Sequence, residues 1–167
     1  MTTNTRNSQA LDVPRDGVAT LLIFFGIAFA PALIGTAFAP DLWYESLNKP
    51  SWNPPGWLFG PVWTVLYLLI GYAGYLAWSS SVGAARQNAF WIFALQLILN
   101  ALWTPLFFGL RSLGLSLVDI IALWLAIFLN VIVFYRLKPA AGLLLAPYWL
   151  WVTFALILNA TIWWLNR

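Results

Sequence analysis

Residues 43–63 read WYESLNKPSWNPPGWLFGPVW and connect two long apolar runs. The stretch contains four tryptophans, one tyrosine, one phenylalanine and four prolines. Because proline restricts its own backbone and cannot continue a helix, the connection is predicted to be stiff. Exposed tryptophans lower solubility, so an aromatic connection is expected to cover something apolar. We therefore interpret residues 40–59 as a stiff aromatic cover beside a hydrophobic bundle, suited to a flat apolar ligand.

The composition on either side of this connection indicates an integral membrane protein. Of the 167 residues, 62% are hydrophobic and 8% are charged, whereas a soluble domain carries about 25% charged residues. Five apolar runs are long enough to cross about 30 Å of hydrocarbon. Because a backbone in lipid must satisfy its own hydrogen bonds, each run is predicted to be a helix. The predicted spans are residues 17–39, 60–79, 89–108, 113–135 and 141–165.

These runs predict an all-α fold with one five-helix transmembrane domain over residues 17–167. Residues 1–16 are predicted to be a polar, flexible N-terminal tail, because they lack an apolar stretch. The 40–59 connection between the first two spans is long. The other connections are short and predict that each span packs antiparallel beside the one before it. They are residues 80–88, 109–112 and 136–140.

The distribution of Lys and Arg predicts the orientation in the membrane. Five of the eight basic residues fall on the N-terminal face and three on the other. This difference favours a cytoplasmic N-terminus and places the 40–59 loop outside. The first group is Arg6, Arg15, Arg86, Arg136 and Lys138, and the second is Lys49, Arg111 and Arg167. These charges are scattered singly along the chain and give no indication of a nucleic-acid partner.

The chain contains no cysteine and no histidine. Their absence excludes disulfides, Cys-based zinc and iron–sulfur sites, Ser–His and Cys–His catalysis, and the usual axial ligands of haem iron. No metal site is predicted. A ligand is therefore expected to be held by aromatic faces, amides, hydroxyls and very few charges.

Polar side chains line one face of the third span. Gln96, Asn100 and Thr104 follow one another at intervals of four residues, with Trp103 beside them. An amide buried in lipid without a partner is costly, so this face is expected to point into the bundle. The spacing favours hydrogen bonds between helices, worth about 0.6–2 kcal/mol each. Recognition of a ligand in a pocket is the alternative.

One acidic residue and three prolines lie within the predicted spans. Asp119 is the one acid within a span, which makes it a functional candidate; the alternatives are a neutral carboxyl or an ion pair with Arg111. Pro31, Pro105 and Pro147 each remove a helical hydrogen bond, and such breaks either shape a cavity or reflect the general frequency of proline in membrane helices.

Eleven of the twelve tryptophans fall into two groups, and Trp124 stands apart from both. An interfacial belt explains those at the span ends, and packing explains Trp124. The first group is Trp78, Trp91, Trp163 and Trp164. The others lie in the loop or near helix breaks, where a belt does not account for them, and are predicted to line a ligand pocket. These are Trp43, Trp52, Trp57, Trp63, Trp103, Trp149 and Trp151.

Three blocks of the sequence resemble the TspO/MBR family, the group of tryptophan-rich sensory proteins and translocator proteins. The blocks are WYESLNKPSWNPPGWLFGPVWTVLY at 43–67, ALQLILNALWTPLFFGL at 94–110 and PYWLWVTFALILNATIWWLN at 147–166. The resemblance extends over about residues 20–166 and suggests a bacterial member. It implies a five-helix membrane protein, commonly a homodimer, whose first loop closes a pocket between the helices.

The resemblance also implies a ligand and a set of residues that bind it. Family members bind porphyrins such as protoporphyrin IX and act in the sensing, regulation or scavenging of tetrapyrroles. No cofactor is expected to be required, and haem is expected to bind only by stacking. Propionates are expected to meet amides or Lys49. Carried over by position, the ligand-binding residues are Trp43, Lys49, Trp52, Trp57, Trp63, Asn100, Trp103, Trp151 and Asn159.

Two other functions compete with binding. One is light-dependent degradation of the porphyrin, for which Trp52 and Trp151 are the candidate catalytic residues, because Ser51 replaces a tryptophan that some relatives carry. The other is transport of a small hydrophobic ligand. The family's cholesterol motif needs a tyrosine in the last span, and Asn159 is followed here by Ala160, Thr161 and Ile162, which argues against specific cholesterol binding.

Overall fold

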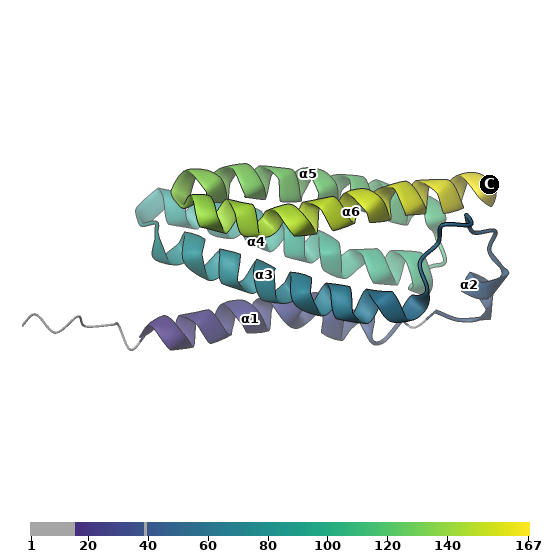
Figure 1. Cartoon of the computed structure of the whole chain (residues 1–167), viewed down its shortest axis with the longest axis horizontal. Coiled ribbons are helices and arrows are strands. Elements are labelled where there is room, and N and C mark those ends of the chain that lie inside the picture. The colour runs from purple at the N-terminus through teal and green to yellow at the C-terminus, as the bar shows by residue number, and fades with distance from the viewer. Residues whose placement is uncertain (1–15, 39) are drawn as a thin grey trace, which may run out of the picture.

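A computed structural model describes residues 16–38 and 40–167, and over these residues it contains helices and no strand. Five helices are long and apolar enough to cross a membrane. The all-α class and the five spans are therefore confirmed (Figure 1). Apart from Asp16, the predicted tail at 1–16 lies outside the described residues. The spanning helices are α1 (Asp16–Gly35), α3 (Phe59–Ser79), α4 (Gly83–Thr104), α5 (Leu113–Leu137) and α6 (Pro139–Leu165).

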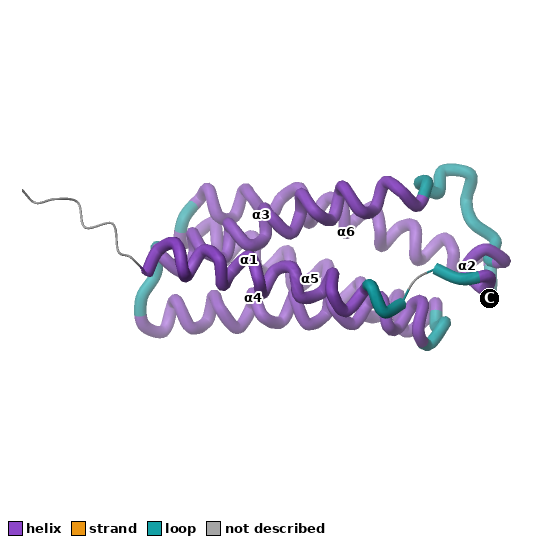
Figure 2. Tube along the Cα trace, turned by 90° about the horizontal axis from the view of Figure 1, so that it is seen from below, coloured by secondary structure: helices purple, strands orange, loops and turns teal. Residues whose placement is uncertain are grey.

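The five long helices form a closed ring in which α1 contacts α3 and α4, α3 also contacts α6, and α5 lies between α4 and α6. The prediction that each span packs beside the one before it is wrong for α3 and α4. Residues 80–82 join these two helices, yet they contact each other little. A short turn sets the antiparallel direction of two helices, but it does not decide which apolar faces meet. The connections collect at the two ends of the ring (Figure 2).

The start of α4 and the end of α1 differ most from the apolar runs; α5 and α6 each extend two residues further, to Leu137 and from Pro139. The helix α4 begins at Gly83 rather than at residue 89, and its first turns carry the polar residues Arg86, Gln87 and Asn88. An apolar run marks only the part of a helix that is suited to hydrocarbon, so it does not show where the polar first turns begin. The helix α1 ends earlier than predicted, at Gly35, because the chain turns through residues 36–38 toward the loop.

Pro105 does not end the third span. A π-helical turn, η2 (Pro105–Gly109), follows α4 directly. The amide of Leu110 donates to the carbonyl of Pro105 at 2.8 Å, five residues back, so the backbone bulges but remains hydrogen-bonded. This bulge places the Phe107 side chain in the interior, where it is 2% exposed.

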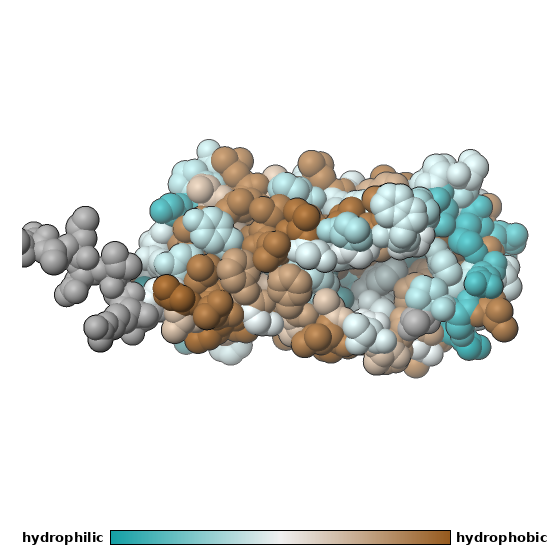
Figure 3. Space-filling view, turned by 60° about the horizontal axis from the view of Figure 1, so that its bottom comes forward, coloured by the Kyte–Doolittle hydropathy of each residue, from teal (hydrophilic) through white to brown (hydrophobic). Residues whose placement is uncertain are grey.

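The long connection is more ordered than a simple loop. It contains a short helix, α2 (Leu42–Ser46), and a 3₁₀ turn, η1 (Gly56–Leu58). Asp41 caps α2, because its carboxylate accepts hydrogen bonds from the backbone amides of Trp43 and Tyr44. Polar side chains gather at the end of the molecule that carries α2, whereas apolar side chains are frequent on the face of the bundle that Figure 3 shows.

Candidate functional site

A cavity of about 390 Å³ lies between the long helices, in the half of the bundle nearest α2. Its volume falls within the range of small-molecule sites, about 300–1,000 Å³. Pro31 of α1 forms part of the wall, so the first of the three predicted helix breakers lies at the cavity. No Lys, Arg, Asp or Glu is among the described residues that line it. The cavity therefore favours an apolar, uncharged part of a ligand.

Aromatic side chains form much of the cavity wall. Trp63, Trp103 and Trp151 all line it, on α3, α4 and α6 respectively. The Trp63 ring stacks on Tyr67 with 5.2 Å between the ring centroids. Phe59 meets the Trp151 ring edge-on at 5.8 Å. Because neighbouring aromatic rings support these indoles, their faces are presented to the cavity in fixed orientations.

A chain of three buried side chains crosses the bundle at the cavity. The Tyr67 hydroxyl donates to Asn100 Oδ1 at 3.0 Å, and Asn100 Nδ2 donates to the Tyr148 hydroxyl at 2.9 Å. Asn100 thus joins α3, α4 and α6 and also lines the cavity together with Thr104. Gln96, one turn away, is buried, and its amide has no hydrogen-bond partner among the described residues. The predicted polar face therefore serves both as a link between helices and as part of the cavity wall.

Asn159 lies behind the wall and holds one of its tryptophans. It is 1% exposed. Its Oδ1 accepts from Trp103 Nε1 at 3.0 Å, while its Nδ2 donates to the carbonyl of Leu113 at 3.3 Å. Asn159 is not among the described residues that line the cavity. Its contacts orient the Trp103 indole and connect α6 to α4 and α5.

Replacement of Asn159 by leucine is expected to destabilise the protein by about 1–3 kcal/mol, because it leaves the Trp103 indole N–H buried without an acceptor. The measurement is the midpoint of thermal unfolding in detergent. Thr161→Val is the matched control on the same helix, since the Thr161 hydroxyl donates to Ile157 within α6. Equal midpoints for the two variants would contradict the assigned role of Asn159.

The other tryptophans predicted to line the pocket lie outside the cavity wall, three of them in the loop. Trp43 packs edge-on against Phe107 at 5.9 Å, and Trp52 meets Phe154 at 6.0 Å. Trp57 is 73% exposed. Trp149, also predicted to line the pocket, instead packs against Trp124 and Phe128 on α5; the centroid distances are 5.1 and 5.4 Å.

Lys49 stabilises the loop itself. Its ammonium donates to the carbonyls of Tyr44, Glu45 and Leu47 at 2.5, 3.1 and 3.1 Å. It also lies 4.6 Å from the centre of the Tyr44 ring. In this conformation the ammonium is engaged within the loop, so a ligand propionate would have to compete for it.

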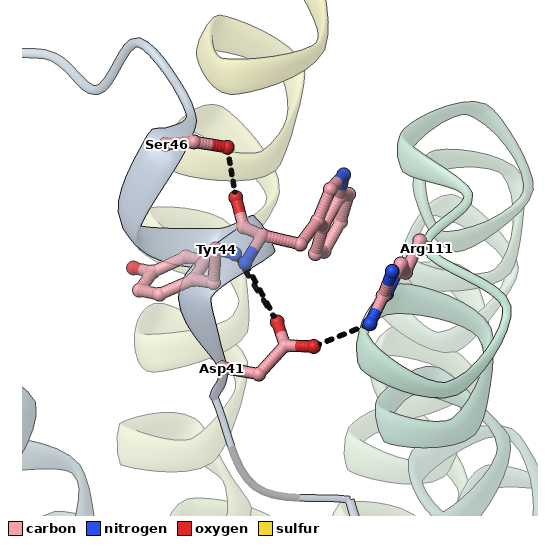
Figure 4. A network of polar contacts seen from close by, with 5 residues as sticks. Asp41, Tyr44, Ser46 and Arg111 are labelled. Carbon is pink, nitrogen blue, oxygen red and sulfur yellow. Dashed lines mark hydrogen bonds and ion pairs between the residues drawn. The ribbon is translucent and has the colours of Figure 1, made fainter.

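Besides these aromatic contacts, two polar contacts fasten the loop to the bundle. Asp41 forms an ion pair with Arg111, with 2.6 Å between Oδ2 and Nη2 (Figure 4). Asn48 forms two backbone hydrogen bonds with the Asn166 side chain, both at 2.9 Å. Because Arg111 pairs with Asp41, the predicted alternative of an Arg111–Asp119 pair is wrong. Asp119 is buried, and its Oδ2 has no hydrogen-bond partner among the described residues.

Acidification is expected to release the Asp41 contact. Desolvation raises the pKa of Asp41, but the Tyr44 amide, the Arg111 guanidinium and the Trp43 amide outweigh it and hold the pKa below its ordinary value of 3.8. Because the pKa of Asp41 is lower in the folded state than in the unfolded chain, the ionised contact stabilises the loop fully above pH 3.8. This stabilisation is lost as the pH falls below 3.8 through the lowered pKa.

The measurement is acrylamide quenching of tryptophan fluorescence as a function of pH. Quenching should increase as the pH falls below 3.8, because Trp43 and its neighbours in the loop become accessible to acrylamide. Asp41→Asn should show the increase already at neutral pH. Glu45→Gln removes a carboxylate of the same helix that has no ion pair among the described residues, and should retain the wild-type profile. If Asp41→Asn also retains it, the ion pair does not fasten the loop.

Tyr67 and Tyr148 belong to the site but were not predicted from the sequence. Tyr67 lines the cavity, and Tyr148, which is 0% exposed, accepts the hydrogen bond from Asn100. Tyrosine counts as apolar in a hydrophobic run, so its hydroxyl does not mark it. The spacing could have predicted Tyr67, because it lies four residues after Trp63 and therefore on the same face of the helix.

Together, the spans and the cavity define a multi-pass integral membrane protein with an aromatic, uncharged cavity in its helical bundle. The sequence pattern of the TspO/MBR family matches residues 19–165, and the chain belongs to this family.

Bacterial and animal relatives both cover most of the chain. The tryptophan-rich protein TspO of Chlorobaculum tepidum is 43% identical over 155 residues, which are 89% of this chain and 97% of that protein. Protein CrtK of Rhodobacter capsulatus is 39% identical over 155 residues, 88% and 93% of the two chains. The human translocator protein is 38% identical over 146 residues, 83% and 86%.

Proposed function

We propose that this protein binds a porphyrin-class ligand in the cavity and acts in the sensing, regulation or scavenging of tetrapyrroles. The observation that carries the proposal is the set of three indoles, Trp63, Trp103 and Trp151, around one uncharged cavity. Planar macrocycles stack favourably on such aromatic faces. A sensory role agrees with the name of a relative, the tryptophan-rich sensory protein of Cereibacter sphaeroides, which is 40% identical over 141 residues.

The polar groups at the cavity suggest how the ligand is oriented. The buried Nε1 of Trp151 has no hydrogen-bond partner among the described residues, so it can donate to an acceptor on the ligand. The cavity wall itself offers no cation to a propionate. The propionate edge therefore points toward the α2 end, where Lys49 and Arg111 lie, and the apolar edge enters the bundle. In this arrangement, the 40–59 loop with Trp43, Trp52 and Trp57 closes over the ligand.

A titration of the detergent-purified full chain with protoporphyrin IX in darkness tests this proposal. We expect saturable quenching of tryptophan fluorescence in the micromolar range. Trp124→Phe should retain the affinity, because Trp124 packs against Trp149 and Phe128 outside the cavity wall. Quenching that rises linearly without saturation would show partition into the detergent and would contradict a binding site.

Light-dependent degradation of the porphyrin is the second candidate function. Trp151 favours it, because this electron-rich indole lies at the cavity with its N–H unpaired. Trp52, the other candidate, packs on Phe154 outside the wall. Illumination of the bound complex should produce a new absorption spectrum that Trp151→Phe abolishes. Loss of absorbance at the same rate in both proteins would exclude a role for Trp151.

A homodimer is part of the same proposal. Gly26 and Ala30 are exposed one turn apart on α1, and a Cβ added to Gly26 would meet nothing within 4 Å. Small residues in such positions let helices of two copies approach closely. The mass of the protein in mild detergent tests this proposal. A dimer is expected, whereas a monomer at every concentration would contradict it.

The proposed orientation places the N-terminus in the cytoplasm and the 40–59 loop outside. It is supported by the sequence, which assigns five Lys and Arg residues to the N-terminal face and three to the other. Because the chain has no cysteine, single cysteines can report each side. In intact cells, an impermeant thiol reagent should label Ser51→Cys and leave Asn88→Cys unlabelled. The reverse pattern would invert the topology.

A further inference from the structure

A row of aromatic rings joins α2 to the cavity wall. The Trp43 ring meets Phe107 edge-on, with 5.9 Å between the ring centroids, and Phe107 stacks on Trp103 at 4.9 Å. Phe108 adds a parallel route, because its ring lies 5.4 Å from Tyr44 and 6.1 Å from Trp103. Trp103 lines the cavity, whereas Trp43 is not among the described residues that do. We call Phe107 and Phe108 the first bridge.

A second row joins the later part of the loop to the wall. The Trp52 ring meets Phe154 at 6.0 Å, and Phe154 lies 5.4 Å from the Trp151 ring. Trp151 lines the cavity, and Trp52 is not among the described residues that do. We call Phe154 the second bridge. Two tryptophans of the loop thus reach the cavity only through phenylalanines that contact the indoles of its wall.

Close packing lets the first bridge transmit a displacement. The π turn η2 places Phe107 in the interior, where its side chain is 2% exposed. Protein interiors have little free volume, so a ring that moves must be accommodated by its neighbours. The Trp103 indole is also restrained from behind, because its Nε1 donates to Asn159 at 3.0 Å. A movement of α2 is therefore expected to alter the orientation of Trp103.

The segment that forms the first bridge also leads to the ion pair of the loop. Arg111 lies two residues after η2 and pairs with Asp41, the N-cap of α2, at 2.6 Å (Figure 4). The φ of Arg111 is 51°, in the left-handed region that residues other than glycine rarely adopt. Such a conformation persists only where the surrounding contacts maintain it. Residues 105–111 thus contact the cavity wall and also fasten the loop.

We propose that Phe107 and Phe154 are positioning residues of the ligand site, through which the fastened loop holds Trp103 and Trp151 in their orientations at the cavity. The ligand is then bound more tightly when the loop is fastened than when it is released. Coupling of this kind is reciprocal, so an occupied cavity fastens the loop by the same factor. Occupancy of the cavity is thereby reported at α2. The part that concerns the ligand rests on the proposed function, whereas the coupling between loop and wall does not.

Fluorine NMR of the ligand-free full chain tests the coupling itself. The protein is labelled with 5-fluorotryptophan, and signals are assigned from Trp103→Phe and Trp124→Phe. Asp41→Asn, which removes the ion pair, should shift the Trp103 signal and leave that of Trp124, which is not among the described residues that line the cavity. Glu45→Gln is the matched control in the same helix and should shift neither signal. An unchanged Trp103 signal in Asp41→Asn would overturn the proposal without any bridge variant.

Variants of the first bridge identify the rings that carry the effect. In Phe107→Leu combined with Phe108→Leu, the shift that Asp41→Asn causes at Trp103 should be lost. Phe154→Leu changes the second bridge and should retain it. If the double variant does not fold, Phe107→Leu alone should reduce the shift, because Phe108 remains in contact with Trp103. An undiminished shift in these variants of the first bridge would overturn the role of Phe107.

The second bridge is tested at the other attachment of the loop. Asn166→Ala removes both hydrogen bonds to Asn48, which lies four residues before Trp52. This change should shift the Trp151 signal, assigned from Trp151→Phe. Phe154→Leu should abolish the shift. A Trp151 signal that responds equally with and without the Phe154 ring would overturn the role of Phe154.

A double-mutant cycle with protoporphyrin IX measures the consequence for binding. Asp41→Asn should weaken binding about fivefold in the wild-type background, the lower end of usual coupling between sites. The same change should have an effect below about twofold when leucines replace the first bridge, because coupled residues are not additive. An equal loss in both backgrounds would show that the loop acts on the ligand directly and would overturn the proposal. If the wild type does not bind protoporphyrin while Trp103 still responds to Asp41→Asn, the proposed ligand is wrong and the coupling holds.

Discussion

Replacement of Trp151 by alanine is expected to weaken protoporphyrin IX binding by about 30-fold, a loss of about 2 kcal/mol. Trp151 lines the cavity from α6 and is supported by Phe59 and Phe154 at 5.8 and 5.4 Å. Alanine would remove the ring that contacts the ligand and also the N–H that has no partner within the described residues. Both losses weaken the complex more than they weaken the unliganded protein.

The measurement is the dissociation constant obtained from fluorescence quenching in darkness. Trp151→Phe keeps an aromatic face and loses the donor, so its affinity should lie between those of the wild type and Trp151→Ala. Trp124→Phe, which changes a tryptophan outside the cavity wall, is the matched control. If Trp151→Ala binds as tightly as Trp124→Phe, the ligand does not occupy this cavity.

Replacement of Gly142 by alanine is expected to destabilise the bundle by about 3 kcal/mol, the upper end of the usual cost of overpacking. A Cβ at Gly142 would lie 2.7 Å from both the Cα and the N of Tyr135. Because the obstacle is backbone, the clash can be relieved only if α5 and α6 move apart. The close approach of these two helices depends on the missing side chain.

The test compares thermal unfolding midpoints of Gly142→Ala and Gly114→Ala in the same detergent. Gly114 in α5 is the control because a Cβ there would meet only Trp163 Nε1, at an ordinary contact distance of 3.6 Å. The Gly142 variant should unfold at a clearly lower temperature, while the Gly114 variant should match the wild type. Equal midpoints would show that the contact between α5 and α6 relaxes at little cost.

The membrane spans could be predicted because the solvent determines them. A backbone in lipid has no water to bind, so a long apolar run must be helical whatever its neighbours are. Pro105 shows the limit of this local reasoning. Proline has no amide hydrogen to donate, so the helix can either break there or continue as a π turn. It continues here because the amides of Leu110 and Ser112 donate to the carbonyls of Pro105 and Leu106.

The candidate site was predictable in part. The spacing of Gln96, Asn100 and Thr104 indicated one face of a helix, with Trp103 beside it. Asn100, Trp103 and Thr104 line the cavity, and Gln96 is not among the described residues that do. Trp63 and Trp151 also lie there, whereas Trp149 does not, although it is only two residues from Trp151. Residues two apart on a helix point in different directions. Clustering in the sequence therefore indicated the region around the cavity, and the rotation of α6 decided which tryptophan lines it.

By itself, the sequence determined that the chain lies in a membrane, how many spans it has, that successive spans run antiparallel, and that the cavity is aromatic. These properties follow from hydrophobicity, helix length and side-chain chemistry, which are local. Tertiary structure alone decided that α1 lies against both α3 and α4, that Arg111 pairs with Asp41 rather than Asp119, and that Asn159 holds Trp103. Each of these contacts joins residues far apart in the chain, and it forms because the faces of the helices pack in one particular way.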